Sequence, residues 1–165
     1  MKPLDPPDSH HLSAAMGWLG LGNVAEAGVE MENIAPQYRS HPHVLAVQFD
    51  IYAQAGKWNE ATEIAGTLAQ QEPQHPGTWI SLAYATRRKN GGGIPQARAI
   101  LIQAQRTFPE EQIIAYNLAC YDCQLGNLDA AKAWLDKACT LGDAGKIKHM
   151  ALQDMDLEPL WADLR

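Results

Sequence analysis

The sequence has few cysteines, few basic residues and no long apolar run. Three cysteines in 165 residues are too few for a disulfide framework, so free thiols are predicted. Lys and Arg total 13 against 19 Asp and Glu, for a net charge of −6. This balance argues against sequence-independent binding of nucleic acid, which depends on basic side chains that neutralise phosphates. No window approaches the roughly 20 apolar residues of a membrane span.

The opening residues, MKPLDPPDSHHL, also lack the charged and apolar regions of a secretory signal. We therefore expect a cytoplasmic protein that does not engage a membrane. Hydrophobic residues make up 46% of the chain and charged residues 19%, a composition typical of a folded domain. At 165 residues, one domain is the expectation.

The common catalytic signatures are missing as well. The sequence contains no G-x-S-x-G, no G-x-x-x-x-G-K-[ST] and no G-x-G-x-x-G. The glycine run at 91–93 is followed by Ile-Pro-Gln and lacks the lysine of a phosphate loop. We therefore predict that the protein is not an enzyme and needs no cofactor.

One stretch, Tyr116 to Leu141, shows two amphipathic helices joined at a Gly-Asn turn. In YNLACYDCQLGNLDAAKAWLDKACTL, small or apolar residues recur three and four positions apart on both sides of Gly126. This spacing predicts a helical hairpin that packs against its neighbours.

The hairpin pattern repeats along the chain. Pro42 and Pro76 both follow a histidine and lie 34 residues apart. Proline at the first position of a helix is a common start, because its missing N–H would have no partner there. The predicted organisation is a tail at 1–7, four repeats at 8–41, 42–75, 76–111 and 112–145, and a C-terminal cap at 146–165. The third repeat is longer because three glycines extend its turn.

Two details concern the ends of the array. Pro36 should stop the second helix of the first repeat near Ile34, since proline cannot continue a helix. Beyond Gly142 we expect two short helices, the second begun by Asp156 as its N-cap. Because the ends of repeat arrays need caps, this tail should cover the open end of the fourth repeat.

These spacings resemble the tetratricopeptide repeat, a 34-residue helical hairpin with the pattern W-x2-L-G-x2-Y, A-x3-F and a closing proline. Asp122 stands where an aromatic residue is usual. The residues that match are Trp79, Leu82 and Ala83, then Ala27 with Met31, Ala61 with Ala65, Ala97 with Leu101, Ala131 with Leu135, and finally Pro73 and Pro109. The last repeat and the Asp-x-Asp-Leu after it are also similar to those of many bacterial members. The resemblance implies an all-α, right-handed α-solenoid of about four hairpins with a C-terminal capping helix.

The resemblance also implies that the first helix of each repeat faces a concave binding groove. The predicted groove residues are Leu12, Met16, Leu19, Asp50, Ile80, Tyr84, Arg87, Arg88, Tyr116, Asn117 and Cys120. Tyr and Arg often carry binding energy at interfaces. We therefore predict a non-catalytic module that binds a partner protein or peptide with acidic or aromatic residues. The arginines are equally consistent with solvated charges at the end of a helix, and the sequence leaves the oligomeric state open.

Two other functions remain as alternatives. Compact acidic members of this family serve as chaperones for secreted or assembled subunits. The other alternative is a thiol- or zinc-dependent enzyme centred on Cys120 and Cys123, with Cys139 and His149 as further ligands, because thiolates and imidazole bind zinc. Cys139 belongs to the following helix, however, and no neighbouring strand supports a redox motif. We predict structural cysteines and no metal.

Overall fold

The computed structural model describes residues 4–164, and within them the regular structure is entirely helical. No described helix is long and apolar enough to cross a membrane. The chain forms two compact units, one ending at Pro73 and the other beginning at Gln74. The predicted all-α architecture of helical hairpins is confirmed.

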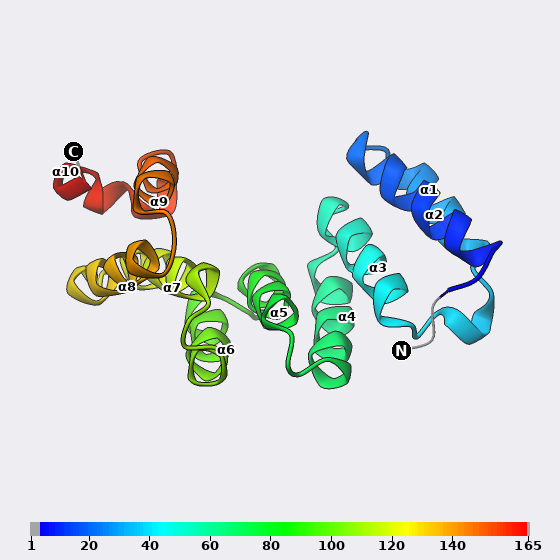
Figure 1. Ribbon diagram of the computed structural model, residues 1–165, viewed down its shortest axis with the longest axis horizontal. Coiled ribbons are helices and arrows are strands. Elements are labelled where there is room, and N and C mark those ends of the chain that lie inside the picture. Colours follow the sequence, from blue (N-terminus) through cyan, green and yellow to red (C-terminus); the bar gives the residue numbers. More distant parts are fainter. Residues whose placement is uncertain (1–3, 165) are drawn as a thin grey trace. The chain divides into compact units, whose positions relative to one another are not determined.

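The first unit contains two helical hairpins. Its elements are α1 (Asp8–Gly20), α2 (Val24–Glu32), the 3₁₀ helix η1 (Pro36–Tyr38), α3 (Pro42–Gln54) and α4 (Trp58–Gln71). Helix α1 packs on α2, and α3 packs on α4 (Figure 1). Helix α3 also contacts both α1 and α2, so the two hairpins share one core.

The second unit contains two hairpins and the C-terminal elements. Its elements are α5 (Pro76–Arg88), α6 (Ile94–Thr107), α7 (Gln112–Gln124), α8 (Leu128–Leu141), α9 (Ala144–Ala151), the 3₁₀ helix η2 (Met155–Leu160) and α10 (Trp161–Leu164). Helices α5 and α6 form one pair and α7 and α8 the next (Figure 1). Helix α6 packs on α7, which joins the two pairs.

Proline sets the helix boundaries as the sequence predicts. Pro42 and Pro76 occupy the first positions of α3 and α5. The side chain of His41 also accepts the backbone N–H of His43 at 3.2 Å, which satisfies one of the free donors at the start of α3. Helix α2 ends at Glu32, before the 3₁₀ turn that begins at Pro36.

The Gly-Asn turn between α7 and α8 depends on backbone hydrogen bonds. Gly126 has a φ of 79°, a conformation that costs glycine little because it lacks a Cβ. Its N–H donates to the carbonyl of Cys123 at 3.0 Å, and the N–H of Asn127 donates to the carbonyl of Asp122 at 2.8 Å. The end of α7 is closed in this way before α8 begins.

The longer turn of the third hairpin packs against the end of α5. The N–H of Gly93 donates to the carbonyl of Thr86 at 3.2 Å. A Cβ on Gly92 would lie 2.0 Å from that same carbonyl oxygen, so only glycine fits there. The extra residues thus form a hydrogen-bonded loop.

Alanines let the paired helices approach closely. The matched alanines of the second helices are all 0% exposed, namely Ala27, Ala61, Ala97 and Ala131. A methyl group at these points leaves room for the bulkier leucines that fill the space between helices, such as Leu101 and Leu135. The sequence pattern and the core therefore coincide.

The C-terminal segment turns back onto α7. Asp143 caps α9 by accepting the N–H of Lys146 at 3.1 Å. The N-cap of η2 is Asp154, whose carboxylate accepts the N–H of Asp156 at 3.0 Å. The prediction that Asp156 caps this helix was wrong, because the carboxylate of Asp156 is engaged by Arg87 instead. Helix η2 packs on α7, the first helix of its pair, as well as on α8.

Candidate functional site

Three side chains of α7 line one face of that helix. Tyr116, Cys120 and Gln124 are spaced four residues apart, so their side chains follow one stripe along the axis. Helix α5 contacts α7 and brings Tyr84 and Arg87 to the same region. We call these five residues the α5–α7 face. All of them belong to first helices of their pairs.

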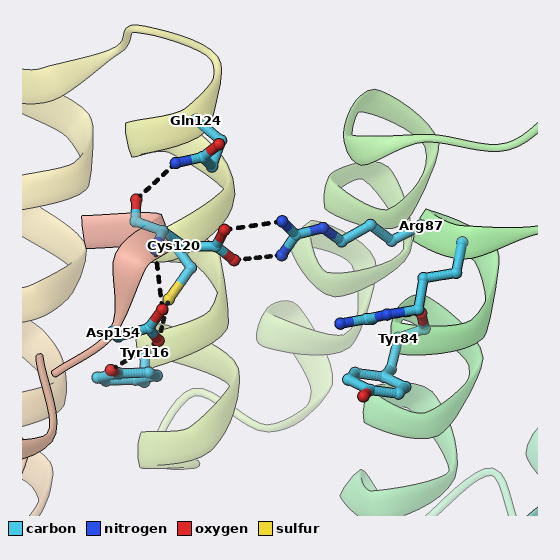
Figure 2. A network of polar contacts seen from close by, with 8 residues as sticks. Tyr84, Arg87, Tyr116, Cys120, Gln124 and Asp154 are labelled. Atoms are coloured by element: carbon cyan, nitrogen blue, oxygen red, sulfur yellow. Dashed lines mark hydrogen bonds and ion pairs between the residues drawn. The ribbon is translucent and has the colours of Figure 1, made fainter. Parts of the chain in front are cut away.

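The α7 part of the α5–α7 face is covered by residues Asp154–Leu160, which we call the tail segment. The hydroxyl of Tyr116 donates to the Asp154 carboxylate at 3.0 Å, and the thiol of Cys120 donates to the same oxygen at 3.5 Å. The side-chain amide of Gln124 donates to the backbone carbonyl of Asp156 at 2.9 Å. Figure 2 shows these contacts along α7, with Arg87 reaching in from α5. The tail segment therefore lies on a surface that the sequence predicts to be a binding groove.

An ion pair joins α5 to the tail segment. The guanidinium of Arg87 donates through both terminal nitrogens to the carboxylate of Asp156, with the Nη2–Oδ1 distance at 2.8 Å. Hydrogen bonding to Asp156 raises the pKa of Arg87, so the guanidinium stays charged. The guanidinium carbon also lies 5.6 Å from the centroid of the Tyr121 ring. Both partners keep about a quarter of their side-chain surface exposed, which places the pair at the edge of the contact.

A second arginine on α5 stacks on an aromatic ring. The guanidinium carbon of Arg88 lies 3.6 Å from the centroid of the Tyr84 ring, and its Nη1 donates to the carbonyl of Tyr84 at 3.0 Å. The side chain of Tyr84 is nevertheless 41% exposed. The stacked pair belongs to α5, and Figure 2 shows its Tyr84 beside Arg87, opposite Tyr116. It adds accessible aromatic and cationic surface next to the tail segment.

Burial raises the pKa of several groups around the α5–α7 face. Loss of solvent is the largest cause for Cys120 and Tyr116, and the carboxylate of Asp154 adds to the effect. Burial also raises the pKa of Tyr121 to about 12. The thiol of Cys120 is therefore protonated at neutral pH, which disfavours a nucleophilic role.

We expect the protein to lose stability as the pH rises above about 9. In the folded state the buried Cys120 and Tyr121 favour their neutral forms, so their folded pKa values exceed the ordinary 9.0 of cysteine and 10.0 of tyrosine. The stability that they contribute is complete below those ordinary values and is lost as the pH rises through the folded values. Urea unfolding midpoints at neutral pH and at about pH 10 measure the loss. Cys120→Ser should show a smaller loss, and equal midpoints for wild type would contradict the assignment.

One cluster of metal-type donors occurs within residues 4–164. The ligand atoms of Cys120, Asp154 and Asp156 lie within 4.8 Å of one another. The cation of Arg87 already pairs with Asp156, however, and burial keeps the Cys120 thiol protonated. The cluster is therefore a hydrogen-bonded network completed by arginine. The alternative zinc set with Cys139 and His149 is not assembled in the part of the chain that the structure describes.

The predicted groove residues outside this region divide into core and surface. Leu12 and Leu19 are buried in the core of the first unit, because α1 turns this side toward α2 and α3. Met16 is 58% exposed, and Asp50 is exposed on α3. These leucines serve packing, whereas Met16 and Asp50 are accessible.

Two further groove positions of the second unit are half-buried. Ile80 packs against the core, and the side chain of Asn117 donates to the carbonyl of Ile113 at 2.8 Å. The structure brings Arg87, Tyr116 and Cys120 together through the tail segment. Ile80 and Asn117 take no part in that network.

Sequence reasoning missed the acidic partners of the face. It assigns Asp154 and Asp156 to a cap over the end of the array, where carboxylates are normally solvated. Their signal is the spacing Asp-x-Asp-Leu, which puts two carboxylates two residues apart just before a buried leucine. That spacing does not predict Arg87 as the partner of Asp156, because Arg87 lies 69 residues earlier in the chain.

A buried ion pair between α6 and α7 was also missed. Asp122 is fully buried and stands where the repeat usually has an aromatic residue. Its carboxylate accepts hydrogen bonds from Nε and Nη2 of Arg98 at 2.9 and 3.0 Å and from the amide of Asn127 at 2.9 Å. Asp122 departs from the repeat pattern, and Arg98 on the neighbouring hairpin neutralises its buried carboxylate.

Known structures share this arrangement of paired helices. TTC0263, a thermophilic TPR protein in Thermus thermophilus, superposes with a TM-score of 0.73 at 22% identity, over 95% of this chain and 82% of that one. The chain has the tetratricopeptide repeat fold. The MamA RS-1 ArsTM double mutant superposes on the same repeat fold with a TM-score of 0.70 at 12% identity, over 84% of this chain and 77% of that one. No protein-family model and no curated protein sequence matches the chain.

Proposed function

We propose that the protein is a non-catalytic module that binds a segment of a partner protein on the first helices of its repeats. The observation that supports this most directly is the α5–α7 face, which holds a short 3₁₀-helical segment of its own chain through side-chain contacts. Helix-to-helix packing in this protein is mainly apolar. Arg87, Tyr116 and Gln124 instead donate hydrogen bonds to a short acidic segment, as the side chains of a peptide-binding surface do.

The chemistry of the surface favours binding over catalysis. Tyr84 and Arg88 present an exposed aromatic ring stacked with a cation, a combination that is enriched at interaction hot spots. Burial holds the pKa of Cys120 well above its ordinary value, which removes the thiolate that a cysteine enzyme requires. A partner segment with acidic and aromatic side chains suits this surface.

Site-specific photo-crosslinking tests the binding surface. The photoreactive residue p-benzoylphenylalanine replaces Tyr84 on α5 in one variant and Leu128 on α8 in another, and both variants are expressed in the native cells. Leu128 is a matched control because it is 38% exposed but begins the second helix of its pair. We expect a discrete protein adduct at Tyr84 that is absent at Leu128.

Competition then checks that the adduct reports a specific site. Excess unlabelled wild-type protein should abolish the Tyr84 adduct, whereas protein with Arg87→Glu and Arg88→Glu should not. An identical set of adducts at both positions, or no adduct at Tyr84, would overturn the proposed binding surface.

A further inference from the structure

The polar contacts of the tail segment are those of a bound peptide. Each carboxylate has a dedicated partner on the α5–α7 face, since Asp156 pairs with Arg87 and Asp154 accepts from Tyr116. A main-chain carbonyl is also bound, by the side chain of Gln124. Charged hydrogen bonds, a tyrosine donor and an amide-to-backbone contact are the usual means by which a groove recognises an acidic segment.

Two leucines follow the acidic residues and anchor the tail segment. Leu157 and Leu160 are 0% and 1% exposed, and both belong to the core cluster of the second unit. The ion pair of Arg87 with Asp156, in contrast, lies at the edge, where both side chains remain partly exposed. The segment therefore combines an accessible acidic part with a buried apolar part, in the order Asp-x-Asp-Leu-x-x-Leu.

We propose that the tail segment is an intramolecular ligand of the α5–α7 face, and that this face binds an acidic segment of another protein with the same Asp-x-Asp-Leu-x-x-Leu pattern. The proposal rests on the proposed function and specifies its partner. Charge complementarity supports this occupant, because Arg87 and Arg88 bring two adjacent cations to a protein with a net charge of −6. At physiological ionic strength, salt screens interactions between exposed charges that are more than roughly 8 Å apart. A segment bound at this face therefore interacts mainly with the two arginines and much less with the negative charges elsewhere on the protein.

The exposed surface beside the tail segment offers contacts with which a partner segment can compete against the tail segment for the α5–α7 face. Tyr84 is 41% exposed and stands opposite Tyr116 in Figure 2. Met155, inside the tail segment, is 63% exposed, so this position adds no buried contact. A partner segment with a larger apolar residue directed at Tyr84 would bury part of this exposed ring and gain contact area.

The covalent attachment of the tail segment gives it an advantage that a partner must overcome. Only two residues, Leu152 and Gln153, separate the end of α9 from Asp154. A ligand held this closely acts at an effective concentration of about millimolar or higher. The face is thus available only for the fraction of time in which the tail segment is displaced, and the apparent affinity for a partner falls by that fraction.

Peptide binding to the full chain tests the proposal. The probe is a fluorescent peptide of residues 153–165, QDMDLEPLWADLR, measured by anisotropy. The proteins are wild type, the variant Asp154→Asn, Asp156→Asn, and that variant with Arg87→Gln added. We expect the double variant to bind the peptide at least about tenfold more tightly than wild type, because its own tail segment competes less well.

Two controls show that the acidic residues are recognised. A peptide with both aspartates changed to asparagine should lose at least about tenfold in affinity for the double variant, and adding Arg87→Gln should produce a similar loss. The single variant Asp156→Asn keeps the Asp154 cap of η2 and serves if the double variant does not fold, with a smaller increase expected. Circular dichroism confirms the fold of each protein.

The outcomes separate this proposal from the proposed function. Equal or undetectable peptide binding to wild type and to a folded Asp156→Asn variant would show that the tail segment is a fixed structural element and would overturn the proposal. A Tyr84 adduct in cells together with that result would leave the proposed function intact. Peptide binding without any cellular adduct would support the intramolecular ligand and count against the proposed function.

Discussion

Replacing Arg98 with methionine is expected to destabilise the protein by about 3 kcal/mol. The substitution leaves the carboxylate of Asp122 fully buried, with the amide of Asn127 as its remaining side-chain partner. An unpaired buried charge costs more than the loss of the pair itself. The figure lies at the lower end of the usual range because Arg98 keeps 33% of its side chain exposed. Urea unfolding followed by circular dichroism measures the change.

Two variants test the reason for this loss. Arg106→Met removes an exposed arginine from the last turn of the same helix and should cost less than about 1 kcal/mol. Adding Asp122→Asn to Arg98→Met removes the orphaned charge and should recover a large part of the stability. If the double variant is no more stable than Arg98→Met, the buried charge is not the cause of the loss.

Replacing Leu157 with alanine should cost about 3 kcal/mol. The side chain is fully buried where η2 packs on α7, and its removal leaves a cavity that the surrounding helices cannot close completely. The matched control is Met155→Ala in the same 3₁₀ helix, which should change stability by less than about 0.5 kcal/mol because Met155 is largely exposed.

The Leu157 variant also reports on the cohesion of the second unit. Hydrogen exchange should become faster in η2 and in the α7 residues that it covers, Tyr116, Cys120 and Gln124. A loss of stability below about 1 kcal/mol, or faster exchange confined to α10, would mean that Leu157 does not anchor the tail segment.

The helices themselves were predictable because their signals are local. Pro42 and Pro76 mark helix starts, Gly126 marks a turn, and small residues such as Ala131 recur where two helices touch. Each of these signals acts through backbone geometry or through the volume of one side chain. A pattern of this kind needs no knowledge of what lies across the contact.

The candidate site was only half predictable for the opposite reason. The register of the repeat placed Arg87, Tyr116 and Cys120 on first helices, and the structure brings these three to the tail segment. The register did not predict that Asp154 and Asp156 are their partners. An acidic residue near a chain end has the same sequence signature whether it is solvated or bound.

Sequence alone determined the all-α hairpin architecture, the helix starts and the first-helix positions of Tyr84, Arg87, Arg88 and Tyr116. Only the tertiary structure decided the contacts between distant residues, such as Arg98 with Asp122 and Arg87 with Asp156. Helix periodicity and turn chemistry are properties of neighbouring residues and can be read in order. Which surface the chain meets after Gly142 depends on the path of the backbone and on the burial of Leu157 and Leu160, which no local pattern specifies.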